Sequence, residues 1–331
     1  MSALPGECPT REGARPVTPF GLAGMPALSR STVDRDESVR SDAERLARRW
    51  SEARLVLVDP RGRTPVHRGG GAPRAEGDGY ALAFQETTPF GAAPPEAAVL
   101  LGVSGGDTYW ALRVGPDEAD RAWEDLRTVG ALLDDTDAGL LTAAVALLNW
   151  HDNANFCAAC GSHTRRVKAG WARDCPGCGR EEYPRTDPAV ICLVHDEEGV
   201  NGEHVLLARQ PVWPAERYSV LAGFVEAGES AEACVAREIA EEVGIAVRDV
   251  RYLGSQPWPL PRSLMMGFAA VASRDAPLRP MDGEIEEARW VHRDQVRAAL
   301  AAGGALPGLI LPGRASIARQ MLEGWANPPG H

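Results

Sequence analysis

The sequence lacks several features that would each indicate a class of protein. None of its apolar runs approaches the roughly 18–20 residues that a membrane-spanning helix needs, so no membrane partner is expected. Positive charge is not in excess, because 35 Lys and Arg stand against 46 Asp and Glu and the net charge is −11. An acidic chain offers no broad electrostatic surface for RNA, so any bound RNA would have to be held at its end.

The chain also lacks a secretory signal and any internal repeat of short period. We therefore expect a cytoplasmic protein whose thiols stay reduced. The chain has 331 residues, of which 44% are hydrophobic. This length is enough for two domains with real cores.

Residues 223–245 contain an acidic pattern with a fixed spacing. A glycine is followed after five residues by a glutamate, and after seven more by Arg-Glu, two further positions and Glu-Glu. The positions are Gly223, Glu229, Arg237, Glu238, Glu241 and Glu242. Nothing from about Ser230 to Val243 breaks a helix, so this segment is predicted to be helical.

The predicted helix has an apolar face and an acidic face when its residues are placed about 100° apart. The apolar face comprises Ala233, Ala236, Ala240 and Val243, and the acidic face comprises Glu238, Glu241 and Glu242. The three carboxylates repel one another by ~0.2–0.5 kcal/mol per pair, and a bound cation would remove this repulsion. Oxygen ligands of this kind suit Mg²⁺ or Mn²⁺. A solvated acidic face without a metal is the alternative interpretation.

Two Cys-x-x-Cys pairs lie upstream, separated by fourteen residues, and a glycine follows each pair. The cysteines are Cys157, Cys160, Cys175 and Cys178. Four thiolates at this spacing predict one closed tetrahedral zinc site, which would be structural because it leaves no position for a substrate. Gly161 and Gly179 would allow the positive φ that each tight turn needs. Two disulfides or free thiols are the alternatives.

A proline-rich segment follows the acidic pattern at residues 256–263, which read Gln-Pro-Trp-Pro-Leu-Pro-Arg-Ser. Its three prolines predict a stiff loop with few backbone donors. Alone, such a segment could be a connector or a ligand for a partner domain.

Together, these motifs resemble those of a known family. The acidic pattern matches the Nudix box in all its fixed positions. The four cysteines, the box and the proline loop together resemble the NADH pyrophosphatase (NudC-type) subfamily of Nudix hydrolases. The resemblance covers about Arg127 to Trp325. One departure is Leu260, where the family usually has Phe. The loss of this aromatic ring could alter dinucleotide preference.

The resemblance implies metal-dependent hydrolysis of the pyrophosphate bond of NAD(H) to NMN(H) and AMP, with Mg²⁺ or Mn²⁺ as catalytic ion and one structural Zn²⁺ per chain. Relatives also remove NAD caps from RNA 5′ ends, and they form homodimers. An ADP-ribose or other dinucleotide pyrophosphatase is the alternative enzyme. A non-catalytic Nudix-like regulator is a further alternative, although such regulators often lose box glutamates that this chain retains.

The resemblance also implies roles for individual residues. Glu242 would be the general base, and Arg237 would form a buried pair with Glu229. The backbone carbonyl of Ala222 and the side chain of Glu284 would complete the metal site. Glu287 is the alternative to Glu284 as a metal ligand. The implied substrate contacts are Arg127, Tyr183, Phe224, Gln256, Pro257, Trp258, Pro259, Leu260, Pro261, Arg262, Ser263 and Ala318. Gly170 stands where some relatives have an acidic substrate contact, so that contact is absent here.

The predicted fold class is α+β, with a Nudix α/β/α sandwich preceded by a Cys₄ zinc ribbon and a degenerate Nudix-like N-terminal domain. The expected parts are a flexible extension (1–40), the N-terminal domain (41–150), the ribbon (156–184) and the catalytic domain (185–331). Strands are predicted at 53–58, 97–103, 109–114, 189–194, 204–208, 264–271 and 288–291. Helices are predicted over much of 118–148 and at 316–325.

Overall fold

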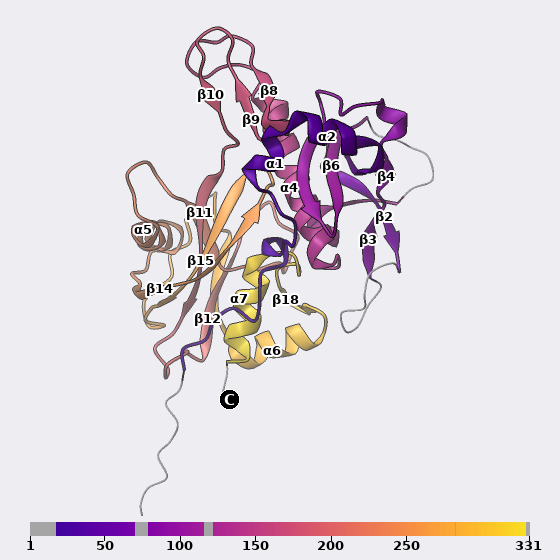
Figure 1. Cartoon of the computed structure of the whole chain (residues 1–331). Helices are drawn as coiled ribbons and strands as arrows, with labels where there is room; N and C mark the ends of the chain where they lie inside the picture. The colour runs from indigo at the N-terminus through magenta and orange to yellow at the C-terminus, as the bar shows by residue number, and fades with distance from the viewer. Residues whose placement is uncertain (1–17, 70–78, 116–121, 282, 329–331) are drawn as a thin grey trace, which may run out of the picture.

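Three parts follow one another along the chain in the computed structural model, which describes residues 18–69, 79–115, 122–281 and 283–328. Figure 1 shows an N-terminal α+β domain, a small three-stranded unit that projects from the molecule, and a second domain of strands and helices that ends the chain. Among the described residues, no helix combines the length and the apolar character that a membrane crossing requires.

The N-terminal domain is built on a four-stranded sheet of order β4-β1-β6-β5 and a smaller sheet of order β3-β2-β7. Its strands are β1 (Arg54–Val58), β2 (Arg63–Arg68), β3 (Tyr80–Leu82), β4 (Gln85–Glu86), β5 (Val99–Ser104), β6 (Asp107–Arg113) and β7 (Trp123–Asp125). Its helices are α1 (Glu37–Ser41), α2 (Ala43–Arg49), α3 (Leu126–Val129) and α4 (Asp135–Asn153). Buried leucines and alanines of α4 share one core with residues of β1, β5 and β6.

The projecting unit is an antiparallel sheet of β8 (Arg165–Val167), β9 (Ala172–Asp174) and β10 (Glu181–Glu182). The C-terminal domain has a six-stranded sheet in which β14-β15-β11-β12-β16 are neighbours and β13 pairs with β11. Its strands are β11 (Asp187–His195), β12 (His204–Arg209), β13 (Leu221–Phe224), β14 (Arg248–Trp258), β15 (Ser263–Val271), β16 (Glu287–His292), β17 (Ala305–Leu306) and β18 (Leu309–Ile310). Its helices are α5 (Ala231–Val243), α6 (Arg293–Ala301) and α7 (Ile317–Ala326).

Strand β11 lies inside the C-terminal sheet and is buried on both faces. Successive side chains of a strand point to opposite faces. Val190, Cys192 and Val194 share a core with α5, whereas Ile191 and Leu193 share a second core with α6 and α7. The sheet is therefore covered by helices on both sides, which confirms the predicted α/β/α sandwich.

Residues 18–36 form an extended segment that contacts both domains, in contrast to the expected flexible extension over residues 1–40. Phe20 is 0% exposed within the core beside α7, and its N–H donates to Asn201 Oδ1 at 2.8 Å. The Arg30 guanidinium donates to backbone carbonyls of the N-terminal domain, and Asp34 pairs with Val103 of β5. Burial of the Phe20 ring stabilises this packing. The first 17 residues lie outside the described residues.

Each predicted strand and the last predicted helix are confirmed within a few residues of their expected ends. The helical prediction over residues 118–148 is partly wrong, and residues 118–121 lie outside the described residues. Residues 123–125 form β7, because they pair with β2 in an antiparallel register. A break at residues 130–134 then separates α3 from the long α4. The sequence also gave no prediction for β14 or α6, and part of the expected proline loop belongs to β14.

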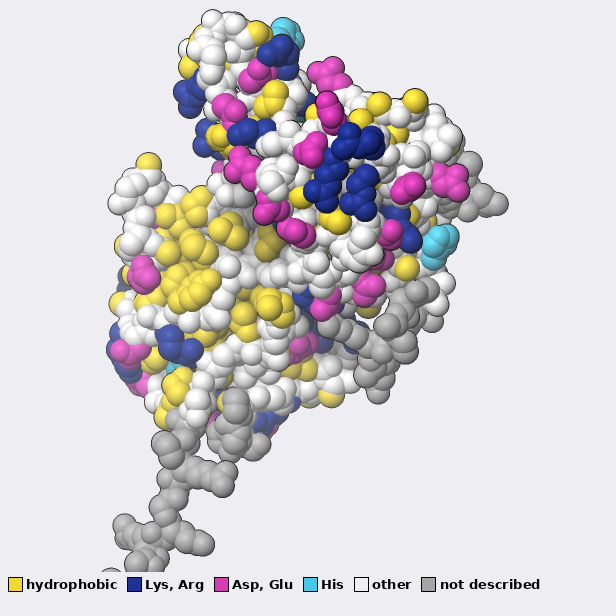
Figure 2. All heavy atoms as spheres, viewed as in Figure 1, with side chains coloured by type: hydrophobic (Ala, Val, Ile, Leu, Met, Phe, Trp, Pro, Cys, Tyr) yellow, Lys and Arg dark blue, Asp and Glu magenta, His cyan; other side chains and the backbone are white. Residues whose placement is uncertain are grey.

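The surface of the C-terminal domain is uneven in polarity. Figure 2 shows hydrophobic side chains gathered on the face of this domain that carries α5, whereas charged side chains are dense around the projecting unit and the neighbouring N-terminal domain. Phe224 and Tyr252 are exposed aromatic residues of the C-terminal domain. This face therefore differs from an ordinary solvated surface.

Phe20→Ala is expected to destabilise the C-terminal domain by about 3–5 kcal/mol, because it removes a fully buried aromatic side chain and leaves a cavity. Urea unfolding followed by tryptophan fluorescence measures this, since Trp325 lies in the same core. Met25→Ala is the matched control, because Met25 belongs to the same segment but is 67% exposed. Equal unfolding free energies for Phe20→Ala and the wild type would show that the segment does not stabilise the domain.

Candidate active site

Helix α5 carries the acidic pattern, and both of its ends are capped. The Ser230 side chain accepts the N–H of Ala233 at 3.2 Å, which satisfies a free donor of the first turn. Gly244 ends the helix in the left-handed conformation with φ of 75°. The predicted helix over Ser230–Val243 is thus confirmed.

The predicted apolar face of this helix is wrong for three of its four residues, because Ala233, Ala236 and Ala240 are exposed. The buried residues are Cys234, Val235, Ile239, Glu242 and Val243. Val235 and Ile239 bury more apolar area than alanines, and this larger gain sets the orientation of the helix. As a result, Glu242 points into the domain while Glu241 faces solvent.

Arg237 binds three of the acidic residues at once. Its guanidinium donates to both Glu229 carboxylate oxygens at 2.8 and 2.9 Å, which confirms the expected pair, although both side chains are half-buried rather than buried. Its Nη1 donates to Glu238 at 3.0 Å and to Glu241 at 2.8 Å. The bonds from Arg237 lower the pKa of Glu229 to about 2. Charge-assisted, bidentate bonds of this kind fix geometry as well as charge.

Glu242 is the buried member of the acidic group. It is 6% exposed, and its Oε2 has no hydrogen-bond partner among the described residues. Burial, followed by the negative charges of Glu238 and Glu284, raises the pKa of Glu242 to about 8. A buried carboxylate oxygen without a donor is costly unless a cation or a proton satisfies it. This single oxygen of Glu242 is therefore suited to a bound cation.

Glu284 and Glu287 are the two candidates for the distal metal ligand, and their interactions in the structure differ. Glu284 is close enough to raise the pKa of both Glu238 and Glu242. Glu287 instead accepts a hydrogen bond from the Tyr218 hydroxyl, with 2.7 Å between the two oxygens. Glu284 therefore stays a candidate for the distal metal ligand, as the resemblance implies.

Gly223 lies on β13 opposite Glu238, next to Ala222. A Cβ at position 223 would overlap the Glu238 carboxylate. The glycine of the box is thus needed for the close approach of a side chain rather than for a turn.

Two groups of possible ligand atoms lie within 4.8 Å of one another among the described residues, namely the four cysteines and the set of Asp196, Glu198 and His204. The box glutamates do not form such a group, because Arg237 draws the Glu238 and Glu241 carboxylates toward itself. The Asp196 carboxylate accepts hydrogen bonds from the His204 ring and from the Glu203 N–H. These bonds stabilise the turn between β11 and β12.

A cavity of about 620 Å³ opens beside Glu242 and is lined by both domains. Expected residues that line it are Arg127, Ala222, Glu242, Gln256 and Trp258. Gln256 is fully buried, and its amide donates to the Ala315 carbonyl at 3.0 Å. Sequence reasoning missed Trp213 and Arg217, which line the same cavity from the loop before β13. No motif or spacing singles them out.

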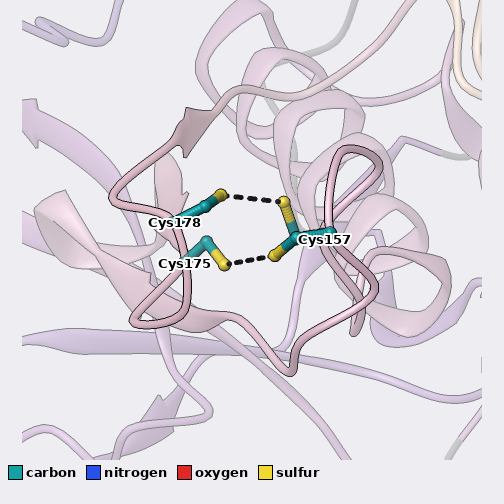
Figure 3. A group of neighbouring side chains, drawn as sticks. Cys157, Cys175 and Cys178 are labelled. Carbon is teal, nitrogen blue, oxygen red and sulfur yellow. Dashed lines mark hydrogen bonds between the residues drawn. The ribbon is translucent and has the colours of Figure 1, made fainter.

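The four cysteines of the projecting unit point toward one another, and three of them are labelled in Figure 3. The Sγ atoms of Cys160 and Cys175 are 3.4 Å apart, and those of Cys157 and Cys178 are 3.7 Å apart. Tetrahedral Zn–S bonds of about 2.3 Å place sulfurs at similar separations. Gly161 and Gly179 have φ of 73° and 74°, as predicted.

Comparison with known proteins accounts for all three parts of the chain. Residues 50–150 match the NADH pyrophosphatase-like rudimentary NUDIX domain, residues 152–183 the NADH pyrophosphatase zinc ribbon domain and residues 185–308 the NUDIX domain. The NAD-capped RNA hydrolase NudC of Mycobacterium bovis is 49% identical over 93% of this chain and 96% of its own length. The chain belongs to the NudC-type NADH pyrophosphatases of the Nudix family.

Two more distant relatives are similar over part of the chain. NAD-capped RNA hydrolase NudC of Stutzerimonas stutzeri is 40% identical over 64% of this chain and 70% of its own length. NAD-capped RNA hydrolase NUDT12 of Macaca fascicularis is 39% identical over 58% of this chain and 42% of its own length.

Several residues that the NudC-type resemblance implied as substrate contacts lie outside the cavity lining. They are Tyr183, Phe224, Pro257, Pro259, Leu260, Pro261, Arg262, Ser263 and Ala318. Tyr183 and Phe224 are exposed aromatics, which leaves their rings accessible. Ala318 is 1% exposed in the core of α7, so its side chain packs rather than faces a ligand.

The proline loop contacts the rudimentary NUDIX domain. Leu260 packs against the core of that domain, and the Pro259 carbonyl accepts from the Asn149 side chain at 3.1 Å. Arg262 donates to Asp187 at 2.8 Å at the start of β11. Leu260, the departure from the family pattern, therefore has a packing role at the domain junction.

The zinc ribbon also rests on the rudimentary NUDIX domain. A Cβ at Gly170 would overlap Val99, and the Trp171 indole donates to the Leu100 carbonyl at 2.6 Å. Glycine in place of an acidic residue thus permits close packing of the ribbon. His151 of α4 bonds the Gly170 carbonyl through Nε2 at 2.8 Å.

The stability of this junction is expected to depend on the protonation of His151. Burial, followed by the positive charge of Arg166, lowers the pKa of His151 to about 3. As pH falls, His151 therefore takes up a proton in the unfolded chain before it does so in the folded protein. The contribution of the neutral imidazole to the free energy of unfolding is fully present above pH 6.5 and is lost as pH falls toward 3. Between pH 7 and pH 5 the loss from this group is about 2 kcal/mol.

The measurement compares unfolding free energies of the wild type and His151→Gln at pH 7 and pH 5. Because the other titrating groups are common to both proteins, the difference isolates His151. The variant is expected to lose less stability than the wild type, and equal losses in the two proteins would contradict the buried neutral imidazole.

Proposed function

We propose that this enzyme hydrolyses the pyrophosphate bond of NAD(H) to NMN(H) and AMP, and that it removes NAD caps from RNA 5′ ends. The observation that carries the proposal is the two-domain cavity, in which the buried carboxyl of Glu242 lies in one lining with Gln256 and Trp258 of the proline segment. The names of the relatives support the same substrates.

The metal site of the proposal consists of Glu238, Glu241, Glu242, Glu284 and the Ala222 carbonyl. A bound Mg²⁺ or Mn²⁺ would neutralise the diphosphate and lower the pKa of a water molecule. Arg237 and Glu229 hold the acidic side chains in place until the ion competes for them. Glu242 lines the cavity, and in this proposal it is the carboxylate that accepts the proton of the attacking water.

The ribbon cysteines bind a structural zinc ion in this proposal. Its role is to fix the ribbon, which packs on the rudimentary NUDIX domain through Trp171. Because that same domain supplies Arg127 to the cavity, the ribbon also helps to keep the two cavity walls together.

We also infer a homodimer in the cytoplasm. Support for the dimer comes from the hydrophobic face of the catalytic domain in Figure 2 and from the exposed ring of Phe224. A surface of this kind is typical of a buried interface. Reduced thiols, which the zinc site needs, are maintained in the cytoplasm.

Incubation with NADH is expected to give AMP and NMNH, and incubation with NAD-capped RNA is expected to give NMN and RNA with a 5′-monophosphate. Glu242→Gln should lower kcat by roughly 10²–10⁴-fold, because it removes the proton acceptor and a metal ligand. Glu232→Gln is the matched control, since Glu232 is an exposed residue in the first turn of the same helix.

Chromatography of the products, with NADH, NAD⁺, ADP-ribose and NAD-capped RNA offered side by side, measures the outcome. A preference for ADP-ribose over NADH would contradict the NAD(H) assignment. An intact cap after long incubation with enzyme that cleaves NADH would contradict the RNA activity alone.

Gly223→Ala is expected to lower kcat by about 10²-fold, because the new Cβ displaces the Glu238 carboxylate from its place beside β13. The melting temperature should change little, since the displaced atoms belong to the end of a flexible side chain. Steady-state kinetics and thermal unfolding are measured together, with Gly21→Ala as the control because a Cβ there meets no atom within 4 Å. Wild-type kinetics for Gly223→Ala would show that Glu238 has no role in turnover.

A further inference from the structure

The loop between β12 and β13 forms a wall of the cavity that the proposed function does not use. Trp213 and Arg217 of this loop line the cavity together with Arg127 and Glu242. Trp213 is half-buried, and the Arg217 guanidinium carbon lies 5.8 Å from the centroid of its ring. The indole therefore gives the guanidinium a flat surface to rest on, at the distance typical of a cation–π contact.

The two arginines of the cavity have no anionic partner within the part of the chain that the structure describes. Neither the Arg127 nor the Arg217 guanidinium forms an ion pair with a described residue, whereas neighbouring arginines such as Arg209 and Arg237 pair with glutamates. The carboxyl that shares the cavity, Glu242, is buried. Arg127 and Arg217 are both exposed and both line this cavity, so their guanidinium groups are accessible to an anionic ligand that enters it.

The backbone on both sides of Arg217 is held in place. The Ile310 N–H donates to the Glu216 carbonyl at 2.6 Å, and the Tyr218 N–H donates to the Ile310 carbonyl at 2.9 Å. Glu216 has φ of 66°, which is uncommon for a residue with a side chain and often marks a functional turn. The backbone that carries Arg217 is thus fixed, so the binding of a ligand needs to order only its side chain.

We propose that Arg217 is a further substrate-binding residue, which pairs with a phosphate of the substrate in the cavity that Arg127 also lines. The inference rests on the proposed function and adds a contact to it. A planar guanidinium binds phosphate oxygens in a bidentate manner, which an ammonium does not. The phosphate belongs either to the diphosphate of NAD(H) or to the first phosphodiester of a capped RNA, and these sources are separable by experiment.

The test measures KM and kcat for NADH and for NAD-capped RNA with the wild type, Arg217→Ala and Arg217→Lys. Loss of a charge-assisted bond is expected to raise KM about tenfold or more in Arg217→Ala, with kcat within about threefold of the wild type. The KM of Arg217→Lys should lie between the KM of the wild type and that of Arg217→Ala. Arg45→Ala is the matched control, because Arg45 is an exposed arginine on α2 that does not line the cavity.

A rise in KM for both substrates assigns the phosphate to the dinucleotide, and a rise for the capped RNA alone assigns it to the RNA chain. Unchanged KM values for both substrates in active, folded Arg217→Ala would overturn this inference and leave the proposed function intact. Failure of the wild type to cleave either substrate would instead overturn the proposed function. Thermal unfolding of each variant confirms that it is folded before the kinetics are compared.

Discussion

The geometry of the active site depends on one guanidinium, that of Arg237. Glu229, Glu238 and Glu241 all bind it, so a single positive charge offsets three negative ones within one turn of helix and the preceding loop. Without this charge, the carboxylates on α5 would repel one another and the loop before the helix would lose its anchor. Glu242 forms no ion pair with Arg237. Its Oε2 has no hydrogen-bond partner in the part of the chain that the structure describes, so a bound cation would stabilise this carboxylate most.

A second constraint joins the two NUDIX domains around the cavity. The segment that contains Phe20 and Arg30 is buried in the catalytic core at one end and bonded to the rudimentary domain at the other. Between these points, the Leu28 N–H donates to Gln256, a residue of the cavity lining. The junction is therefore part of the cavity lining, to which the rudimentary domain contributes Arg127.

Sequence reasoning predicted those features that depend on local spacing. The zinc knuckles, the helix of the box and the Arg237–Glu229 pair follow from residues close together in the chain, and the fold class followed from the family resemblance. The orientation of α5 was mispredicted, because alanines suggested an apolar face although Val235 and Ile239 bury more surface. Phe20 lies in a segment rich in glycine and proline, and only its long-range contact with Asn201 and the α7 core reveals its role.

The molecule carries a net negative charge, whereas two arginines line its cavity. This distribution of charge favours binding of a substrate by its end. A net charge of −11 repels the extended backbone of a nucleic acid, which would otherwise compete for any site with exposed arginines. Arg127 and Arg217 are exposed residues that both line the cavity beside Glu242, so an anion that enters the cavity can meet both charges. A dinucleotide satisfies this condition, and so does the capped end of a longer chain. The net negative charge and the two arginines of the cavity thus both favour a substrate held at its end over one held along a strand.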